Sequence, residues 1–300
     1  MRLRELSRWL TWASRVVLAL LAYPSLAAAT GTPIPHGTLE LVAENQWIPA
    51  GHEFNLGLHF QLEKGWHIYW INPGDSGEPP RVTWHLPAGL TAEPIEWPTP
   101  IRLGHSTIVD FGYEDSVTLI VPVRAEHTMA ADTPAQLGAE VKVLICREMC
   151  VPGKAQLSLT LPVKSQPPAP DMEASALFSG ARKSLPRPAP KTWRLSAHYS
   201  KDSLILTGNL GNAVTHAYFF PLIDSQIDNA APQRFLSSST GFQLTLRKST
   251  RLLKPIDRLQ GVLVLSAGRA YVIDLPLAKP AATSKPALMR NSSVAKIRFS

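Results

Sequence analysis

The sequence predicts an all-β protein, and three observations support that prediction. Short runs that alternate between apolar and polar residues recur between turn signals, along residues 38–163 and again along residues 192–278. β-branched and aromatic residues dominate these runs, as they do in strands. Proline is frequent, at 27 residues, whereas only 18% of all residues are charged. Many short strands at this spacing favour an immunoglobulin-like antiparallel β-sandwich, followed by a second, smaller β-sandwich.

The first domain is expected over residues 30–164, with about seven strands. In residues 54–62 every second residue is phenylalanine or leucine, and polar or small residues stand between them. That period of two is typical of a strand buried on one side. The expected strands are residues 38–45, 53–63, 67–73, 81–87, 116–123, 139–146 and 155–163.

Residues 165–191 interrupt the strand pattern. Proline clusters flank a stretch that predicts one short helix, roughly residues 172–184, and we interpret the whole segment as an interdomain linker. The second domain is expected over residues 192–278, with a hairpin that turns at residues 267–269. Its expected strands lie within residues 193–200, 203–210, 216–222, 241–248 and 261–277.

The N-terminal residues 1–29 have the order of a signal peptide: a basic start, an apolar run and small residues at the end. Ala27 and Ala29 form an A-x-A cleavage pattern. The apolar run contains Pro24 and is shorter than the roughly 20 residues of a spanning helix, so we expect it to be removed. We also expect no transmembrane span in the mature chain, which would reside in an oxidising, extracytoplasmic space.

The formal charge of +7 comes mostly from the two ends of the chain. The signal segment carries a net +3, and residues 279–300 carry +5 with no acid, which leaves about −1 for the body between them. This basic tail has no hydrophobic pattern, so we expect it to be disordered. A nucleic-acid-binding protein would carry its basic excess in the folded part. The charge distribution therefore excludes that class.

The chain has two cysteines, and both fall within "VLICREMCVPG" (residues 143–153). Strand patterns precede and follow them, so the three residues between Cys146 and Cys150 become a hairpin connection. Residues that flank such a loop lie about 4.5 to 5.5 Å apart at Cα. Disulfide geometry accepts that distance, so the pair can close without moving the strands.

A disulfide that closes so small a loop contributes little stability in the chain-entropy model. A pair that alternates between dithiol and disulfide suits thiol exchange instead. Two alternatives stay open: a passive clip in a secreted, non-catalytic binding or assembly protein, and a Cu(I) site formed by Cys146, Met149 and Cys150. The histidines lack metal-ligand spacing, and hydrolase and phosphate-loop motifs are missing from the sequence. For a thiol-exchange protein we therefore expect no resident metal and no cofactor, and bound copper belongs only to the alternative.

Three motifs in order resemble the N-terminal periplasmic domain of the thiol:disulfide interchange protein DsbD. They are "GWHIYWINPGDSGEPP" (residues 65–80), "VDFGYED" (residues 109–115) and the cysteine hairpin. The resemblance covers residues 38–163 and is closest to the version in ScsB, a suppressor of copper sensitivity. It implies an immunoglobulin-like fold and a link to copper tolerance.

The resemblance also implies a function and roles for the cysteines. Domains of this family pass electrons from a membrane-linked, thioredoxin-like donor to periplasmic oxidoreductases. Cys150 matches the attacking cysteine and Cys146 its partner. The sequence contains neither the membrane domain nor the thioredoxin-like domain of DsbD, so we expect a periplasmic thiol:disulfide oxidoreductase that receives electrons in trans.

Four more residues acquire roles from the resemblance. Phe111 would lie in a cap loop over the disulfide, with Asp110 beside it. Tyr69 and His67 lie two residues apart on one strand face and would flank the sulfurs.

Overall fold

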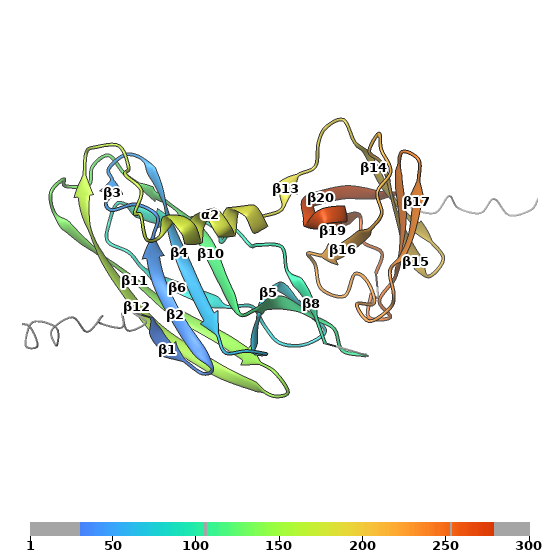
Figure 1. The fold of residues 1–300 in the computed structure, drawn as a ribbon, viewed down its shortest axis with the longest axis horizontal. Coiled ribbons are helices and arrows are strands. Elements are labelled where there is room, and N and C mark those ends of the chain that lie inside the picture. Colours follow the sequence, from blue (N-terminus) through green and yellow to red (C-terminus); the bar gives the residue numbers. More distant parts are fainter. Residues whose placement is uncertain (1–30, 105–106, 253, 279–300) are drawn as a thin grey trace, which may run out of the picture.

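The computed structural model describes residues 31–104, 107–252 and 254–278. They form two β-rich domains joined by a helical segment (Figure 1). The expected signal peptide and basic tail lie outside the described residues. Within the described ranges, no helix is both long and apolar enough to cross a membrane.

The first domain consists of two sheets that enclose one hydrophobic core, so the predicted all-β sandwich is confirmed. One sheet has the strand order β1-β2-β4-β10-β7 and the other β3-β12-β11-β5-β9-β8, with β6 paired to β11. The strands of the first sheet are β1 (Thr32–Ile34), β2 (Gly37–Ala43), β4 (Glu53–Leu62), β10 (Ser116–Ala125) and β7 (Leu90–Ala92). Those of the second sheet are β3 (Ile48–Pro49), β12 (Cys150–Lys164), β11 (Pro134–Cys146), β5 (His67–Gly74), β9 (Asp110–Glu114), β8 (Ile101–Leu103) and β6 (Arg81–His85).

Strand β4 is buried on both faces, whereas the sequence predicts burial on one. Its phenylalanine and leucine residues face the core, as expected. The opposite face is covered by helix α2 (Ser175–Ser184), whose fully buried Phe178 packs against Ile120 of β10. A Cβ atom on Gly57 would come within 3.1 Å of the Phe178 ring, so the glycine lets the helix approach the sheet. The Pro-rich segment therefore packs against the first domain instead of spanning open space.

The eight strands of the second domain pair into one sheet with the order β16-β19-β20-β14-β15-β18-β17, and β13 pairs with β20. A parallel pair, β14 with β20, joins the two halves of this sheet around a separate core. The hairpin predicted at residues 267–269 is confirmed, because β19 and β20 flank the short 3₁₀ turn η1 (Ser266–Gly268). The strands are β13 (Arg187–Pro188), β14 (Arg194–Ser200), β15 (Ser203–Asn209), β16 (Ala217–Pro221), β17 (Arg234–Ser238), β18 (Gly241–Arg247), β19 (Arg258–Leu265) and β20 (Arg269–Ala278).

The two domains meet at the C-terminal end of β5. The Phe220 ring of β16 lies edge-on to Phe111 and Trp70, with ring centroids 5.2 and 6.4 Å apart. Beside these rings the buried Asn72 donates a hydrogen bond from its amide nitrogen to the carbonyl oxygen of Pro221, at 2.7 Å. Apolar packing and a buried hydrogen bond thus hold the second domain against the strand that leads to the cysteine pair.

Candidate functional site

The cysteine pair closes at the tip of the longest hairpin in the described chain. Strand β11 ends at Cys146 and β12 begins at Cys150, and the two residues are register partners. They form a disulfide, with a Cα–Cα distance of 4.1 Å, slightly less than the sequence predicts. The hairpin can close because residues 147–149 form a tight turn, in which the Arg147 backbone N–H donates to the Met149 carbonyl oxygen at 3.1 Å.

The two cysteines differ in exposure. Cys146 is 2% exposed, because it also faces β5 as the register partner of His67. Cys150 lies on the exposed side of the hairpin tip. An external thiolate therefore reaches the Cys150 sulfur more easily than that of Cys146.

Tyr69 is the side chain that contacts a sulfur atom. Its hydroxyl oxygen lies 3.5 Å from the Cys150 Sγ. A disulfide sulfur carries no hydrogen, so the tyrosine hydroxyl is the donor. Burial raises the pKa of Tyr69, and the nearby Asp110 carboxylate adds to that effect against a hydrogen bond from Ser76 that lowers it. The hydroxyl therefore stays protonated and able to donate over the physiological pH range.

A loop covers the ring of Tyr69. Gly77 has a φ of +74°, and a Cβ atom there would lie 2.1 Å from the ring carbon that bears the hydroxyl. Glycine is needed at this position both for the backbone conformation and for the space. The loop of residues 75–77 thus lies directly on the tyrosine that contacts Cys150.

Asp110 holds this loop from strand β9. Its two carboxylate oxygens accept hydrogen bonds from the Ser76 backbone N–H and from the Ser76 hydroxyl, both at 2.9 Å. The predicted position of Asp110 near the disulfide thus corresponds to a contact with the loop that covers Tyr69.

His67 lies next to Tyr69, with the rings edge to face at 5.3 Å. Burial lowers the pKa of His67, while the Asp110 and Glu114 carboxylates oppose that change. Its Nε2 atom is buried without a hydrogen-bond partner among the described residues. Because its pKa is lowered, His67 is a neutral imidazole beside the sulfur pair at neutral pH.

The expected cap loop requires a correction. Residues 110–114 form strand β9, which pairs with β5 on one side and β8 on the other. Gly112 faces Tyr69 in the register, so Phe111, one residue away, points to the opposite face of the sheet. Phe111 is fully buried against Phe220. The structure therefore does not place Phe111 over the disulfide. Strand β9 is paired on both sides, and the apolar ring of Phe111 packs in the core between the domains.

The described residues around the disulfide include no cluster of metal ligands. Within the described ranges, no three His, Cys, Asp or Glu side chains are grouped so that they could hold an ion. Met149, the third sulfur of the copper alternative, is 69% exposed. The neighbouring Arg147 places its guanidinium over the Trp66 ring, 5.1 Å from its centroid.

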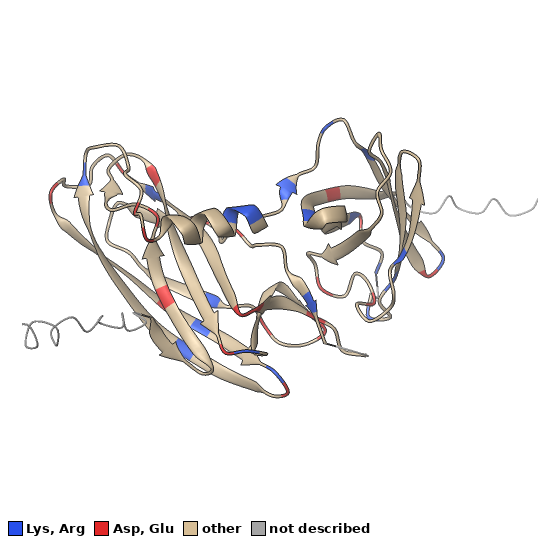
Figure 2. Cartoon of the chain, in the orientation of Figure 1, with Lys and Arg blue, Asp and Glu red and all other residues tan. Residues whose placement is uncertain are grey.

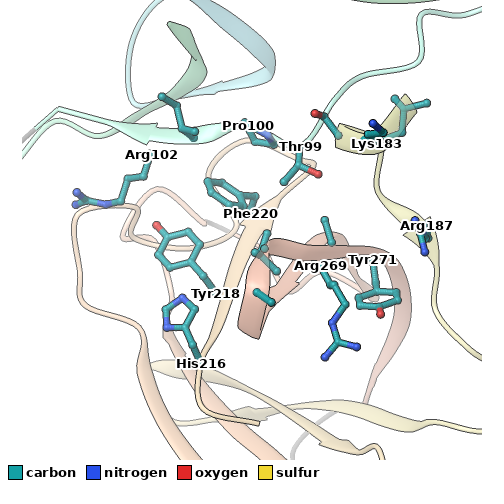
Figure 3. A pocket seen from close by; sticks show the side chains of 17 residues that line it. Thr99, Pro100, Arg102, Lys183, Arg187, His216, Tyr218, Phe220, Arg269 and Tyr271 are labelled. Atoms are coloured by element: carbon teal, nitrogen blue, oxygen red, sulfur yellow. The ribbon is translucent and has the colours of Figure 1, made fainter. Parts of the chain in front are cut away.

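A cavity of about 740 Å³ lies elsewhere, between the two domains (Figure 3). Arg102 and Lys183 line it from the first-domain side, and Arg187 and Arg269 from the second-domain side. The ribbon is correspondingly blue at the end of α2 and at β13 (Figure 2). No carboxylate is among the described lining residues, so the cavity has a positive potential. None of the predicted site residues lines it.

Sequence reasoning missed the loop of residues 75–77. The sequence of residues 75–77 predicts an ordinary turn, because Asp, Ser and Gly are the usual turn residues. Their inclusion in the motif of residues 65–80 was the one available signal. Only the fold brings this loop onto Tyr69 and against the second domain.

The fold and the site together define a class: a two-domain β protein with a disulfide at an exposed hairpin tip, contacted by a tyrosine. Residues 39–162 match the family model described as thiol:disulfide interchange protein DsbD, N-terminal. The first domain of this chain is thus similar in sequence to DsbD N-terminal domains.

One solved structure supports the two-domain arrangement. The N-terminal periplasmic domain of ScsB from Proteus mirabilis aligns with a TM-score of 0.61 and 16% identity, over 82% of this chain and 94% of that chain. At this identity the likeness concerns the fold alone. The periplasmic chaperone SfaE (TM-score 0.20, 9% identity, 80% of this chain and 100% of that chain) and the pilin subunit BcpA of Bacillus cereus (0.22, 7%, 81% and 69%) are too dissimilar to support an argument. A comparison with curated proteins finds no match.

Proposed function

We propose that this protein is a periplasmic thiol:disulfide exchange module that relays reducing equivalents through Cys146 and Cys150. The observation that supports this most is the unequal exposure of the two cysteine residues in a hairpin-tip disulfide. The match of residues 39–162 to the DsbD N-terminal family supports the reaction type and, with the ScsB likeness, the compartment. Removal of a signal peptide over residues 1–29 belongs to the same proposal.

The proposed relay has two balanced half-reactions. In the first, a donor thiolate attacks the exposed Cys150 Sγ, and the Cys146 thiolate leaves. A second donor thiolate then resolves the mixed disulfide, which leaves both cysteines reduced and the donor oxidised. In the second half-reaction, the Cys150 thiolate attacks a client disulfide and releases one client thiolate. Cys146 then attacks Cys150 Sγ, so the hairpin disulfide re-forms and the client leaves as a dithiol.

The proposed partners are thioredoxin-like proteins on both sides of the relay. A membrane-linked donor would supply electrons in trans, and periplasmic oxidoreductases would accept them. The exposed turn of residues 147–149 suits docking of such a partner, because the turn projects beyond the strands.

Trapping of a mixed disulfide tests the proposal. A Cys146→Ala variant lacks the resolving thiol, so Cys150 is expected to stay joined to a thioredoxin-like protein whose own resolving cysteine has been replaced. The matched Cys150→Ala variant should trap several-fold less, because Cys146 is buried. Equal absence of adducts in both variants would contradict the relay.

The reduction potential separates exchange from a structural clip. Equilibration of the wild-type disulfide with glutathione should give a value in the range of exchange proteins. A value below about −300 mV would indicate a structural bond and the non-catalytic alternative.

A further inference from the structure

We propose that Asp75 is a positioning residue, through which the second domain holds Tyr69 against the Cys150 sulfur. This inference rests on the proposed function and gives the second domain a role in it. It concerns residues outside the cysteine hairpin: Asp75 in the first domain, and Asn229 and Arg251 in the second.

Asp75 receives both second-domain contacts on one oxygen. The amide nitrogen of Asn229 donates to its Oδ1 at 3.0 Å, and the Arg251 guanidinium lies 3.3 Å from the same atom. The Asp75 side chain is only 16% exposed, whereas that of Arg251 is 60% exposed. The carboxylate thus lies in the seam between the domains, and the arginine reaches it from the rim.

The other side of Asp75 is bonded to the first domain. Its Oδ2 accepts a hydrogen bond from the Val109 backbone N–H at 2.9 Å, and its own N–H donates to the Val109 carbonyl oxygen at 2.9 Å. Asp75 thereby connects Asn229 and Arg251 to the start of the loop of residues 75–77 and to the chain just before β9.

Each following residue of the loop continues this connection toward the sulfur. Ser76 donates two hydrogen bonds to Asp110. Gly77 packs on the Tyr69 ring so closely that no side chain fits between them. The Tyr69 hydroxyl then contacts the Cys150 Sγ. A continuous series of contacts thus runs from Arg251 to the sulfur.

Further contacts restrict the second domain to this end of β5. The buried hydrogen bond from Asn72 to Pro221 lies three residues before Asp75, and Phe220 packs on Trp70, the residue after Tyr69. The second domain therefore contacts β5 and its loop at three positions that follow Tyr69 in the chain. Loss of the Asp75 contacts is therefore expected to loosen the loop of residues 75–77 before it affects the rest of β5.

The chemical consequence concerns the reduced state. A tyrosine hydroxyl that donates to a thiolate stabilises the charged form and lowers the pKa of the thiol. A loop that presses the ring into place keeps that donor aligned and closes the Tyr69 side of the otherwise exposed sulfur to small thiols. Loss of the Asp75 contacts is expected to raise the pKa of the Cys150 thiol and to speed reduction of the disulfide by small reagents.

The test uses the full chain with an Arg251→Gln substitution, which removes the ion pair and keeps much of the side-chain length. Two quantities are measured: the rate constant for reduction of the disulfide by dithiothreitol, and the pKa of Cys150 from thiolate absorbance. The rate should rise by about threefold or more, and the pKa should rise. An Asn229→Ala variant should change both quantities in the same direction.

Arg258→Gln is the matched control. Arg258 forms an ion pair with Asp274, 2.6 Å apart, within the second domain. The same substitution there removes an exposed ion pair but touches no loop residue, so both quantities should equal those of the wild type. If Arg251→Gln and Asn229→Ala also behave like the wild type, the positioning role of Asp75 is wrong.

A double-mutant cycle isolates the contact. Asp75→Asn removes the charge and keeps an acceptor oxygen, so its effect and that of Arg251→Gln should be non-additive in the double variant. Fully additive effects would show that the two residues act independently and would overturn the inference. A wild-type disulfide with a potential below about −300 mV would instead refute the proposed function itself. The two failures are thus distinguishable.

Discussion

Tyr69 connects the cysteine pair with the rest of the protein, because its hydroxyl group contacts the Cys150 sulfur. It is 1% exposed, yet its hydroxyl reaches the sulfur of the exposed cysteine. Hydrogen bonds to charged groups are stronger than those to neutral groups, so the contact gains importance when Cys150 becomes a thiolate.

Replacement of Tyr69 by phenylalanine is expected to raise the pKa of the Cys150 thiol. The ring stays in place, but the hydroxyl donor is lost, and a hydrogen bond to a charged group contributes about 1.5–3 kcal/mol, or roughly one to two pKa units. Thiolate absorbance of the reduced protein, followed against pH, measures the change. Tyr113→Phe is the control, because its hydroxyl bonds to the Pro98 carbonyl oxygen away from the sulfurs. An unchanged pKa in Tyr69→Phe would mean that the hydroxyl does not stabilise the thiolate.

Gly77→Ala is expected to displace the Tyr69 ring. The substitution introduces a Cβ atom 2.1 Å from the ring and also strains a backbone with a φ of +74°. Gly211→Ala controls for the strain, because Gly211 has a φ of +80° but open space around it. Both variants should lose about 1 kcal/mol or more of stability. In Gly77→Ala alone, the rate of disulfide reduction by dithiothreitol should also change. Equal rates in the two variants would contradict a packing role for the loop.

At the scale of the elements, pairing of β4 with β10 determines how the first sheet responds to pH. His59 of β4 is the register partner of Thr118 of β10, and its Nδ1 lies 2.9 Å from the threonine hydroxyl oxygen. Burial lowers the pKa of His59, with a smaller opposing effect of Glu40. Helix α2 and the Gly57 contact bury this face of the sheet.

The stability of the first domain should fall as the pH is lowered below about 6.5, the ordinary histidine pKa. In that range the unfolded chain binds a proton at His59, while the folded chain resists it until the pH reaches the lowered pKa. The unfolded state therefore binds more protons, and the free energy of unfolding decreases with falling pH. His67 contributes with the same sign, because its pKa is also lowered.

Urea unfolding at pH 7 and pH 5 measures this dependence. A His59→Gln variant should lose less stability between the two pH values than the wild type, because glutamine does not titrate. A variant with the same pH dependence as the wild type would show that His59 is not responsible.

At the scale of the whole molecule, the second domain packs on the first through Phe220. This ring contacts Phe111 and Trp70, and it joins the core of the first domain. An apolar interface of this kind limits the relative motion that domains otherwise show.

Phe220→Ala is expected to loosen the two domains, because loss of a buried phenylalanine side chain costs about 3–5 kcal/mol. Small-angle scattering should show a larger radius of gyration, and disulfide reduction by dithiothreitol should accelerate as the Asp75 contacts open. Leu236→Ala is the control, since Leu236 is 61% exposed. An unchanged radius of gyration would mean that other contacts suffice to hold the domains together.

The all-β class and the cysteine hairpin could be predicted because both depend on local information. Alternating apolar residues specify a strand with a buried face, and two strands joined by three residues bring Cys146 and Cys150 together. The resemblance of residues 65–80 also drew attention to Tyr69, whose hydroxyl oxygen lies 3.5 Å from the Cys150 Sγ.

The placement of Phe111 and the role of Asp75 were not predictable in this way. Phe111 was expected above the disulfide, but the pleat of β9 turns it toward Phe220. The domain boundaries at residues 164 and 192 stay a prediction. The segment between them does not belong to one domain, because α2 packs against the first domain and β13 pairs with a strand of the second.

The sequence by itself determined the strands, the hairpin and the sulfur pair, since these arise between residues that are neighbours in the chain. Only the tertiary structure decided that Asp75 meets Arg251, 176 residues away, and that Asn72 meets Pro221, 149 residues away. The physical reason is that such contacts depend on how two finished cores pack together, and no local periodicity records that packing.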